Sequence, residues 1–191
     1  MSANTKPEHY ELGAFISDLR SIASENLDER EILCRVGPLA KKVALDKSWL
    51  KPEHYDVNSG ESFRSNLLHV EEDQSLFVVA VSWLPGKGTP AHDHGTWAVV
   101  VGVDGPERNV FWNRIDDGQT PGYAKLEMTE NKVMLESDVV AMPAGMIHSV
   151  KNESDQTTLS FHVYGKHLNH TGRSQFNPDR CTERPFLIQT R

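Results

Sequence analysis

The chain from Ser65 onward is a series of short runs rich in β-branched and aromatic residues, with turn-forming residues between them. We expect strands at 76–84, 97–103, 110–115, 124–128, 132–135, 139–141, 148–150 and 158–164. The pair Asp104-Gly105 is a typical hairpin signal between two of these runs. Because no helical pattern separates the strands, we predict a mainly β fold built on an antiparallel barrel, and not a parallel α/β sheet.

The first fifty residues have a different, helical periodicity. Apolar residues recur there at spacings of three and four, which places them on one face of a helix. The first stripe comprises Tyr10, Leu12, Phe15, Ile16, Leu19 and Ile22, and the second comprises Leu27, Ile32, Leu33, Val36, Leu39, Val43 and Leu45. Asn26 or Asp28 is the expected N-cap of the second helix. We therefore predict two or three amphipathic α-helices that cover one face or end of the barrel.

The length of the chain, 191 residues, is ample for one domain with a sizeable core and short for two. We predict a single domain over residues 1–191, with a helical prefix at 1–50, the barrel at 62–165 and a C-terminal extension over the barrel at 166–191. The sequence identifies no interface, so it leaves both a monomer and a homodimer open.

The charge of the chain argues against two classes of partner. A net charge of -7 and a pI near 5.7 come without any basic run, so we expect neither nucleic acid nor a membrane as partner. The first residues are polar and do not resemble a signal peptide, and no apolar run is long enough to span a bilayer. We therefore expect a cytoplasmic protein.

Two histidines, His92 and His94, are separated by one residue in a segment that we expect to be extended. Alternate side chains of a strand share a face, so both imidazoles can point inward and bind one metal ion. A third histidine, His148, follows a predicted turn at Pro143 and Gly145 and begins the next strand. We predict that these three histidines are metal ligands.

This pattern, His-x-His followed by Pro-x-Gly-x-x-His, resembles the two-part signature of the cupin superfamily. The resemblance implies a cupin double-stranded β-helix barrel, which can hold one ligand in its mouth. Ser137 stands where cupins usually have glycine, and residues 97–100 contain no carboxylate where most cupins have a metal-binding glutamate. The resemblance therefore implies a site of three neutral imidazoles.

A second set of polar residues lies in the run Ser160-Phe-His162-Val-Tyr164. Alternation places the serine, the histidine and the tyrosine on one face of the predicted strand. Polar groups on an otherwise apolar strand are costly unless they bond to one another or to a ligand. We predict a hydrogen-bonded chain from the serine hydroxyl through the imidazole to the phenol.

Together with the three histidines, this row resembles the thiol dioxygenases of the cysteine dioxygenase type, over nearly the whole chain. The resemblance implies that the histidines bind ferrous iron and that Tyr164, held by His162 and Ser160, lines the site for oxygen and substrate. The animal enzymes also have a cysteine that cross-links to the tyrosine. Because Ala98 and Val99 stand at that place, we expect Tyr164 to be a free phenol.

Two arginines are candidates for binding the substrate carboxylate. In the animal enzymes an arginine directly precedes an Asn-Leu pair, but here Ser65 precedes Asn66-Leu67 and Arg64 lies one place earlier. Arg173 stands at a position that resembles that of the carboxylate-binding arginine of the bacterial 3-mercaptopropionate dioxygenases. The resemblance implies that Arg173 holds the carboxylate, with Arg64 as the alternative.

The predicted function is an iron(II)-dependent dioxygenase that adds both atoms of O2 to the sulfur of a small carboxylate-bearing thiol, with 3-mercaptopropionate first, and produces a sulfinic acid. The same reaction on cysteine or mercaptosuccinate is an alternative. An alternative of another class is a non-catalytic metal-binding cupin that senses or stores a small acid. The metal that is loaded also stays open, because three-histidine sites accept several divalent ions.

Overall fold

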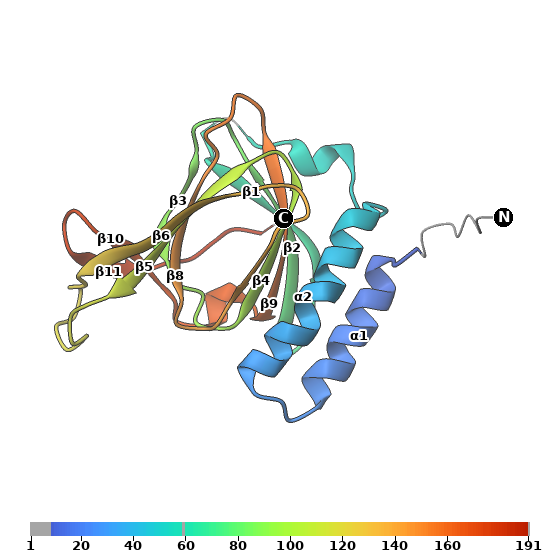
Figure 1. Ribbon diagram of the computed structural model, residues 1–191, viewed down its shortest axis with the longest axis horizontal. Helices are drawn as coiled ribbons and strands as arrows, with labels where there is room; N and C mark the ends of the chain where they lie inside the picture. Colours follow the sequence, from blue (N-terminus) through green and yellow to red (C-terminus); the bar gives the residue numbers. More distant parts are fainter. Residues whose placement is uncertain (1–8, 59, 191) are drawn as a thin grey trace.

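Two α-helices pack on one side of a β-barrel in the computed structural model, which describes residues 9–190 except residue 59 (Figure 1). They are α1 (Leu12–Ser24) and α2 (Glu29–Asp46). The Asp28 carboxylate accepts a hydrogen bond from the Glu31 backbone N–H at 2.8 Å, and the Glu31 carboxylate accepts one from the Asp28 N–H at 3.2 Å. This capping box starts α2 at Asp28, one of the two predicted caps. None of the helices in the described residues has the length and apolarity needed to cross a membrane.

The strands in the described part of the chain form two antiparallel sheets. The first has the order β1 (Phe63–Val70), β2 (Ser75–Trp83), β9 (Thr158–Lys166), β4 (Ala98–Asp104) and β7 (Val139–Met142). The second has the order β11 (Thr182–Pro185), β10 (Ser174–Asn177), β3 (Gly88–His92), β8 (Ile147–Lys151), β5 (Glu107–Arg114) and β6 (Leu126–Met134). Two short 3-10 helices, η1 (Pro52–Tyr55) and η2 (Leu168–His170), join the described strands and helices. The predicted fold class, a mainly β barrel preceded by N-terminal helices, is confirmed.

The first sheet separates two apolar cores. Its outer face packs against the helices, where Phe15 and Leu19 of α1 and Val36 and Val43 of α2 are fully or almost fully buried. Its inner face, together with residues of the second sheet, encloses a second apolar cluster inside the barrel. Helices stabilise the barrel by burying one apolar stripe each, as the predicted spacing requires.

One part of the strand pattern was predicted wrongly. Residues 124–128 and 132–135 were expected to be two strands, but β6 runs without a break from Leu126 to Met134. This strand is at the edge of its sheet and its residues 127–133 are exposed, so its sequence has no alternation of apolar and polar residues that would reveal it. Four further strands, β1, β3, β10 and β11, were not among the predicted strands.

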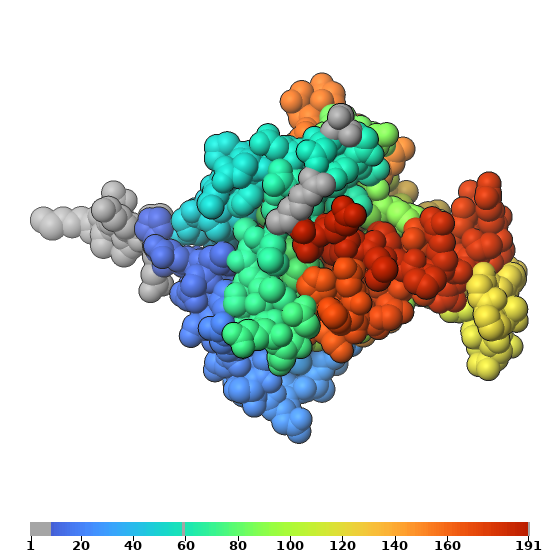
Figure 2. Space-filling view, turned by 180° about the vertical axis from the view of Figure 1, so that it is seen from behind, coloured from blue at the N-terminus to red at the C-terminus, as the bar shows by residue number. Residues whose placement is uncertain are grey.

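The end of the chain returns to the barrel after β11 (Figure 2, red). The backbone N–H of Phe186 donates to the Arg173 carbonyl at 3.1 Å, and the N–H of Ile188 donates to the Asn169 side-chain oxygen at 3.0 Å. Thr190 then pairs with Ser65 of β1. These contacts place Phe186 and Ile188 in the wall of a pocket inside the barrel.

Candidate active site

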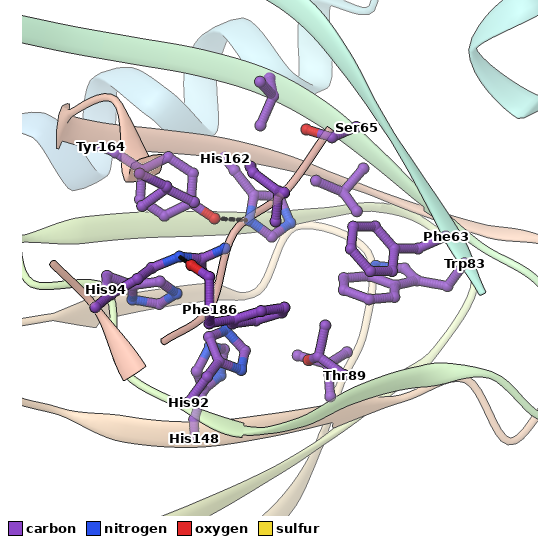
Figure 3. A pocket seen from close by; sticks show the side chains of 16 residues that line it. Phe63, Ser65, Trp83, Thr89, His92, His94, His148, His162, Tyr164 and Phe186 are labelled. Carbon is purple, nitrogen blue, oxygen red and sulfur yellow. Dashed lines mark hydrogen bonds between the residues drawn. The ribbon is translucent and has the colours of Figure 1, made fainter. Parts of the chain in front are cut away.

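Three histidines meet inside the barrel, where β3 and β8 lie side by side (Figure 3). His92 ends β3 and pairs with His148 on β8, and His94 follows two residues after β3. One ligand atom from each ring lies within 4.8 Å of the others. The exposed fractions of the three are 5% or less, and they form the one such group of metal-binding side chains within the described residues.

The local backbone explains why these strands bring the rings together. Gly88 at the start of β3 approaches β8 so closely that a Cβ would collide with the Val150 carbonyl oxygen. The backbone N–H of Met146 donates to the Pro143 carbonyl at 3.0 Å, which closes the turn before β8. The turn predicted at Pro143 is present, and it places His148 one residue into the strand.

Hydrogen bonds hold two of the rings in one tautomer. His92 Nδ1 lies 2.9 Å from the Pro90 carbonyl oxygen, and His148 Nδ1 lies 3.1 Å from Asn109 Oδ1. Both partners are acceptors, so each Nδ1 carries the proton and each Nε2 keeps its lone pair for a ligand. His94 Nδ1 is buried and has no hydrogen-bond partner among the described residues.

Burial keeps the three imidazoles neutral. Desolvation, and then the neighbouring His148, lower the pKa of His92 and of His94 well below the usual range of histidine. Desolvation, followed by the charge of Arg173, lowers the pKa of His148 to about 4. Neutral imidazoles are the form that binds metal, so this donor set fits a divalent transition metal at neutral pH.

β9 carries a row of three polar side chains, of which His162 and Tyr164 line the pocket together with the three histidines. Ser160 Oγ lies 2.8 Å from His162 Nε2. His162 Nδ1 lies 2.8 Å from the Tyr164 hydroxyl, and Figure 3 marks this hydrogen bond with a dashed line. All three side chains are buried. Burial, followed by His148, lowers the pKa of His162 to about 3, and burial raises the pKa of Tyr164. The imidazole and the phenol are therefore both neutral near pH 7.

Arg173 is the buried cation of the pocket. Its exposed fraction is 4%, its Nε donates to the Phe186 carbonyl at 3.1 Å, and its guanidinium carbon lies 4.1 Å from the Phe186 ring centre. Its Nη2 has no hydrogen-bond partner in the described chain, and no described carboxylate lies within ion-pair distance. Burial lowers its pKa to about 10, so it stays charged at neutral pH. This side chain is a donor prepared for an anion.

The other candidate arginine, Arg64, does not reach the pocket. Its neighbours on β1, Phe63 and Ser65, both line the pocket, and alternation therefore directs Arg64 to the opposite face. Its Nη1 donates to the backbone carbonyls of Glu53 and Asp56 at 3.3 and 2.7 Å. The structure thus brings Arg173, and not Arg64, to the histidines.

Two buried polar residues of β5 were missed by the sequence analysis, because the predicted strand began at Val110. β5 begins at Glu107, and the buried residues Glu107, Asn109 and Phe111 alternate along it. Asn109 holds His148, and the Glu107 carboxyl oxygen Oε2 lies 3.1 Å from Ser160 Oγ. The signal that would have revealed them is this alternation, extended back to the Asp104-Gly105 turn.

Comparisons with known proteins find distant likenesses to several solved structures. No family model matches the chain. A cupin superfamily protein from Desulfitobacterium hafniense is 12% identical, with a TM-score of 0.43 over 59% of this chain and 84% of that chain. A Klebsiella pneumoniae protein with a double-stranded β-helix domain is also 12% identical, with a TM-score of 0.46 over 66% and 94%.

Oxalate oxidase in complex with the substrate analogue glycolate is 16% identical, with a TM-score of 0.47. The match covers 62% of this chain and 57% of that chain, which is less than two thirds of its length.

Proposed function

We propose that the protein is an iron(II)-dependent thiol dioxygenase that adds both atoms of O2 to the sulfur of a small thiol carrying a carboxylate. The preferred substrate of this proposal is 3-mercaptopropionate, and the product is its sulfinic acid. One observation carries the proposal: a buried group of three neutral histidines, a hydrogen-bonded tyrosine and a free guanidinium edge share one pocket.

The histidines would hold the metal through nitrogens that are already neutral at pH 7. Ferrous iron bound there would supply the redox chemistry that joins dioxygen to sulfur, and its charge, uncompensated by a carboxylate ligand, would favour the thiolate. The protein's own part is to hold sulfur and oxygen close together in a fixed orientation.

Arg173 would hold the substrate carboxylate. Its Nε donates a hydrogen bond to the Phe186 carbonyl and its guanidinium lies over the Phe186 ring, so the guanidinium is held in place before substrate arrives. The free Nη2 can then donate to a carboxylate oxygen in a charge-assisted bond. Phe186, Leu168 and Ile188 line the same pocket and would exclude water from the contact.

Tyr164 would donate a hydrogen bond to the bound oxygen or to the substrate acid. Its ring centre lies 5.2 Å from that of His94, so the tyrosine ring lies beside one of the three histidines. Its raised pKa keeps the proton on the phenol, and His162 fixes the position of the oxygen. The pocket would then hold one neutral donor, Tyr164, and one cationic donor, Arg173.

The walls of the pocket favour 3-mercaptopropionate over cysteine. No aspartate or glutamate is among its 16 described lining residues, so the ammonium group of cysteine has no acidic partner there. For mercaptosuccinate, Arg173 is the one permanently charged side chain among these residues, so a second carboxylate would lack a cation. The non-catalytic metal-binding cupin remains the alternative of another class.

The experiment is oxygen uptake by anaerobically iron-loaded protein with 3-mercaptopropionate, cysteine, cysteamine and mercaptosuccinate. We expect uptake that is fastest with 3-mercaptopropionate, and sulfinate formation in a one-to-one ratio with O2. The Arg173→Ala variant should raise KM by about 100-fold, as expected for losing a buried charge-assisted bond. Arg64→Ala is the matched control and should turn over like the wild type, because Arg64 lies outside the pocket.

Three outcomes would contradict parts of the proposal. Equal loss in both arginine variants would remove Arg173 as the anchor while keeping the reaction. A clear preference for cysteine would refute the argument from the missing acidic partner. Stoichiometric iron binding without uptake with any of the four thiols would favour the non-catalytic cupin.

A further inference from the structure

The buried row of β9 does not end at Ser160, because it continues to a carboxyl group. Glu107 of β5 has an exposed fraction of 1%, and its Oε2 lies 3.1 Å from Ser160 Oγ. Its other oxygen lies 3.5 Å from the Thr158 hydroxyl. No described cation forms an ion pair with it, which is unusual for a fully buried carboxylate. Glu107 is therefore one end of a hydrogen-bonded row whose other end is the Tyr164 hydroxyl.

The Ser160 hydroxyl can donate its hydrogen bond to either of two neighbours. It lies within bonding distance of Glu107 and of His162, but it has one proton to donate. The Trp83 indole N–H donates to the same oxygen at 3.2 Å and occupies one of its two lone pairs. Ser160 must therefore donate to one of the two neighbours and accept from the other.

The direction in which Ser160 donates determines the direction of every hydrogen bond from Glu107 to Tyr164. If Glu107 is protonated, it donates to Ser160, Ser160 donates to His162 Nε2, and His162 Nδ1–H donates to the Tyr164 oxygen. The hydrogen of the Tyr164 hydroxyl is then free to point into the pocket. If Glu107 is ionised, every donor is reversed, and the Tyr164 hydrogen points to His162 Nδ1.

We propose that Glu107 is a positioning residue that sets the direction of donation along Ser160, His162 and Tyr164, and so decides whether the tyrosine hydrogen faces the metal pocket. The two alternative hydrogen-bond orders follow from the geometry. The effect on turnover of a switch between these orders rests on the proposed function, because there Tyr164 must donate toward the oxygen or the substrate.

The switch balances in protons. Glu107 passes its proton to Ser160, Ser160 passes one to His162 Nε2, His162 passes its Nδ1 proton to the Tyr164 oxygen, and Tyr164 releases its own into the pocket. Each of the three intervening groups gains one proton and loses one. The net change is the loss of one proton from Glu107 and its release beside the metal ligands, with no ion left in the middle of the row.

The surroundings of Glu107 place the switch near neutral pH. Burial raises its pKa to about 8, and hydrogen bonds from Ser160, Thr158 and Trp83 oppose that rise. The titratable groups of β9 on its side of the sheet are His162 and Tyr164, which stay neutral in this range.

The charged residues of the other neighbouring strands face away from it. Arg108, next to Glu107 on β5, is paired with Glu153 at the surface, 2.6 Å away. On β8, Lys151 is exposed. From β2, Trp83 contributes an indole that does not ionise in this range, and on β6 the register partner is Met134. Glu107 is thus the group in this row whose charge changes between pH 7 and 9.

The test is the tautomer of His162, read from the ring 15N shifts of the full chain loaded with zinc, which is diamagnetic. We expect Nδ1–H in the wild type at pH 6 and Nε2–H at pH 10, with a midpoint near pH 8. The Glu107→Gln variant should keep Nδ1–H throughout, because an amide donates to Ser160 at every pH. Glu153→Gln, an exposed carboxylate beside the same strand, should titrate like the wild type.

Oxygen uptake gives the second readout. Between pH 7 and pH 9 the wild-type rate should fall about tenfold, as one group with this pKa loses its proton, and Glu107→Gln should lose that fall. A wild-type His162 tautomer that stays constant from pH 6 to 10 would overturn the proposal, whatever the variant does.

If Glu107→Gln fails to fold, the Ser160→Ala variant tests the same proposal. Removing the serine hydroxyl interrupts the hydrogen-bonded row between Glu107 and His162, so the pH dependence of the His162 tautomer should disappear. A tautomer change with a midpoint near pH 8 that persists in Ser160→Ala would overturn the role of Glu107. If the zinc-loaded protein shows the tautomer switch but the iron-loaded protein consumes no oxygen with any of the four thiols, this inference is kept and the proposed function is refuted.

Discussion

The two faces of β9 carry opposite chemistry. Toward the helices it presents Phe161 and its neighbours Leu159 and Val163, all completely buried in an apolar layer. Toward the pocket it presents Ser160, His162 and Tyr164, which are as deeply buried and are polar. The strand therefore buries both faces, but one face gains its stability from dispersion and hydrophobic transfer, and the other has to satisfy each polar atom.

This difference shows how the fold can support a reactive site. The apolar face is complete without any ligand, since ring contacts and helix packing fill it. The polar face carries a hydrogen-bonded row, and the Arg173 guanidinium, which lines the same pocket, has an Nη2 without a hydrogen-bond partner in the described chain. Changes on the first face should therefore act on stability, and changes on the second should act on metal, proton and substrate.

The largest effect is expected on the helix-facing side. Phe161 lies 5.7 Å from the Phe15 ring and 5.1 Å from the Trp49 ring, measured between centres. Phe161→Ala should lower the free energy of unfolding by about 3–5 kcal/mol, because a cavity replaces these contacts. Urea denaturation measures this, and the folded fraction should bind metal with unchanged stoichiometry. A decrease in the free energy of unfolding of less than about 1 kcal/mol would show that the helix-facing side of β9 is not the side that stabilises the fold.

The next effect belongs to the pocket side. Tyr164→Phe removes the hydroxyl that bonds to His162 and should lower the rate of oxygen uptake by about 100-fold. The stability loss should be about 1 kcal/mol, the value of one buried hydrogen bond. Tyr55→Phe is the matched control, because that hydroxyl bonds to Asp104 outside the pocket, 3.0 Å away. Similar rates for the two variants would remove Tyr164 from the proposed chemistry.

A pH effect separates the polar face from the apolar one. The folded-state pKa of His162 is about 3, below the usual value of about 6.5 for an unfolded chain, so the unfolded chain takes up a proton first as the pH falls. Its contribution to stability is complete above pH 6.5 and is lost as the pH falls toward 3. Between pH 7 and 5, metal-free wild type should lose roughly 1–2 kcal/mol more than His162→Gln. Equal losses in urea titrations would contradict the neutral buried state of His162.

The smallest effect tests a residue behind the histidines. Asn109→Ala removes the acceptor for His148 Nδ1 and should weaken metal binding about tenfold, because the ring loses its fixed tautomer. Competition with a chelator measures this. Asn131→Ala is the control, since that side chain bonds to Arg108 at the surface. An unchanged affinity in Asn109→Ala would mean that packing alone orients His148.

Local pattern in the sequence was enough for several elements. The two helical stripes predicted α1 and α2, and the alternation in residues 158–164 predicted which side chains of β9 share a face. The Pro-x-Gly turn before His148 is likewise a local property, which the Met146-to-Pro143 hydrogen bond shows. These features depend on residues within a few positions of each other, so their periods are visible in one dimension.

Pairings between distant segments were not visible in that way. The sequence indicated Arg64 and Arg173 as rival anchors, and the face of β1 on which Arg64 lies removes it from the pocket. Likewise Glu107 and Asn109 look like turn-proximal polar residues until β5 aligns them with Ser160 and His148. A buried carboxyl that is 53 residues from its partner has no local signature.

The sequence by itself determined the class of fold, the histidines available as ligands and the order of the polar row, because strand alternation and turn chemistry are local. The tertiary structure decided which groups become neighbours. The pairing of β3 with β8 brings His92 beside His148, and the packing of β5 against β9 supplies the carboxyl behind Ser160. Strand order and register set these contacts, and both are settled only when the whole barrel closes.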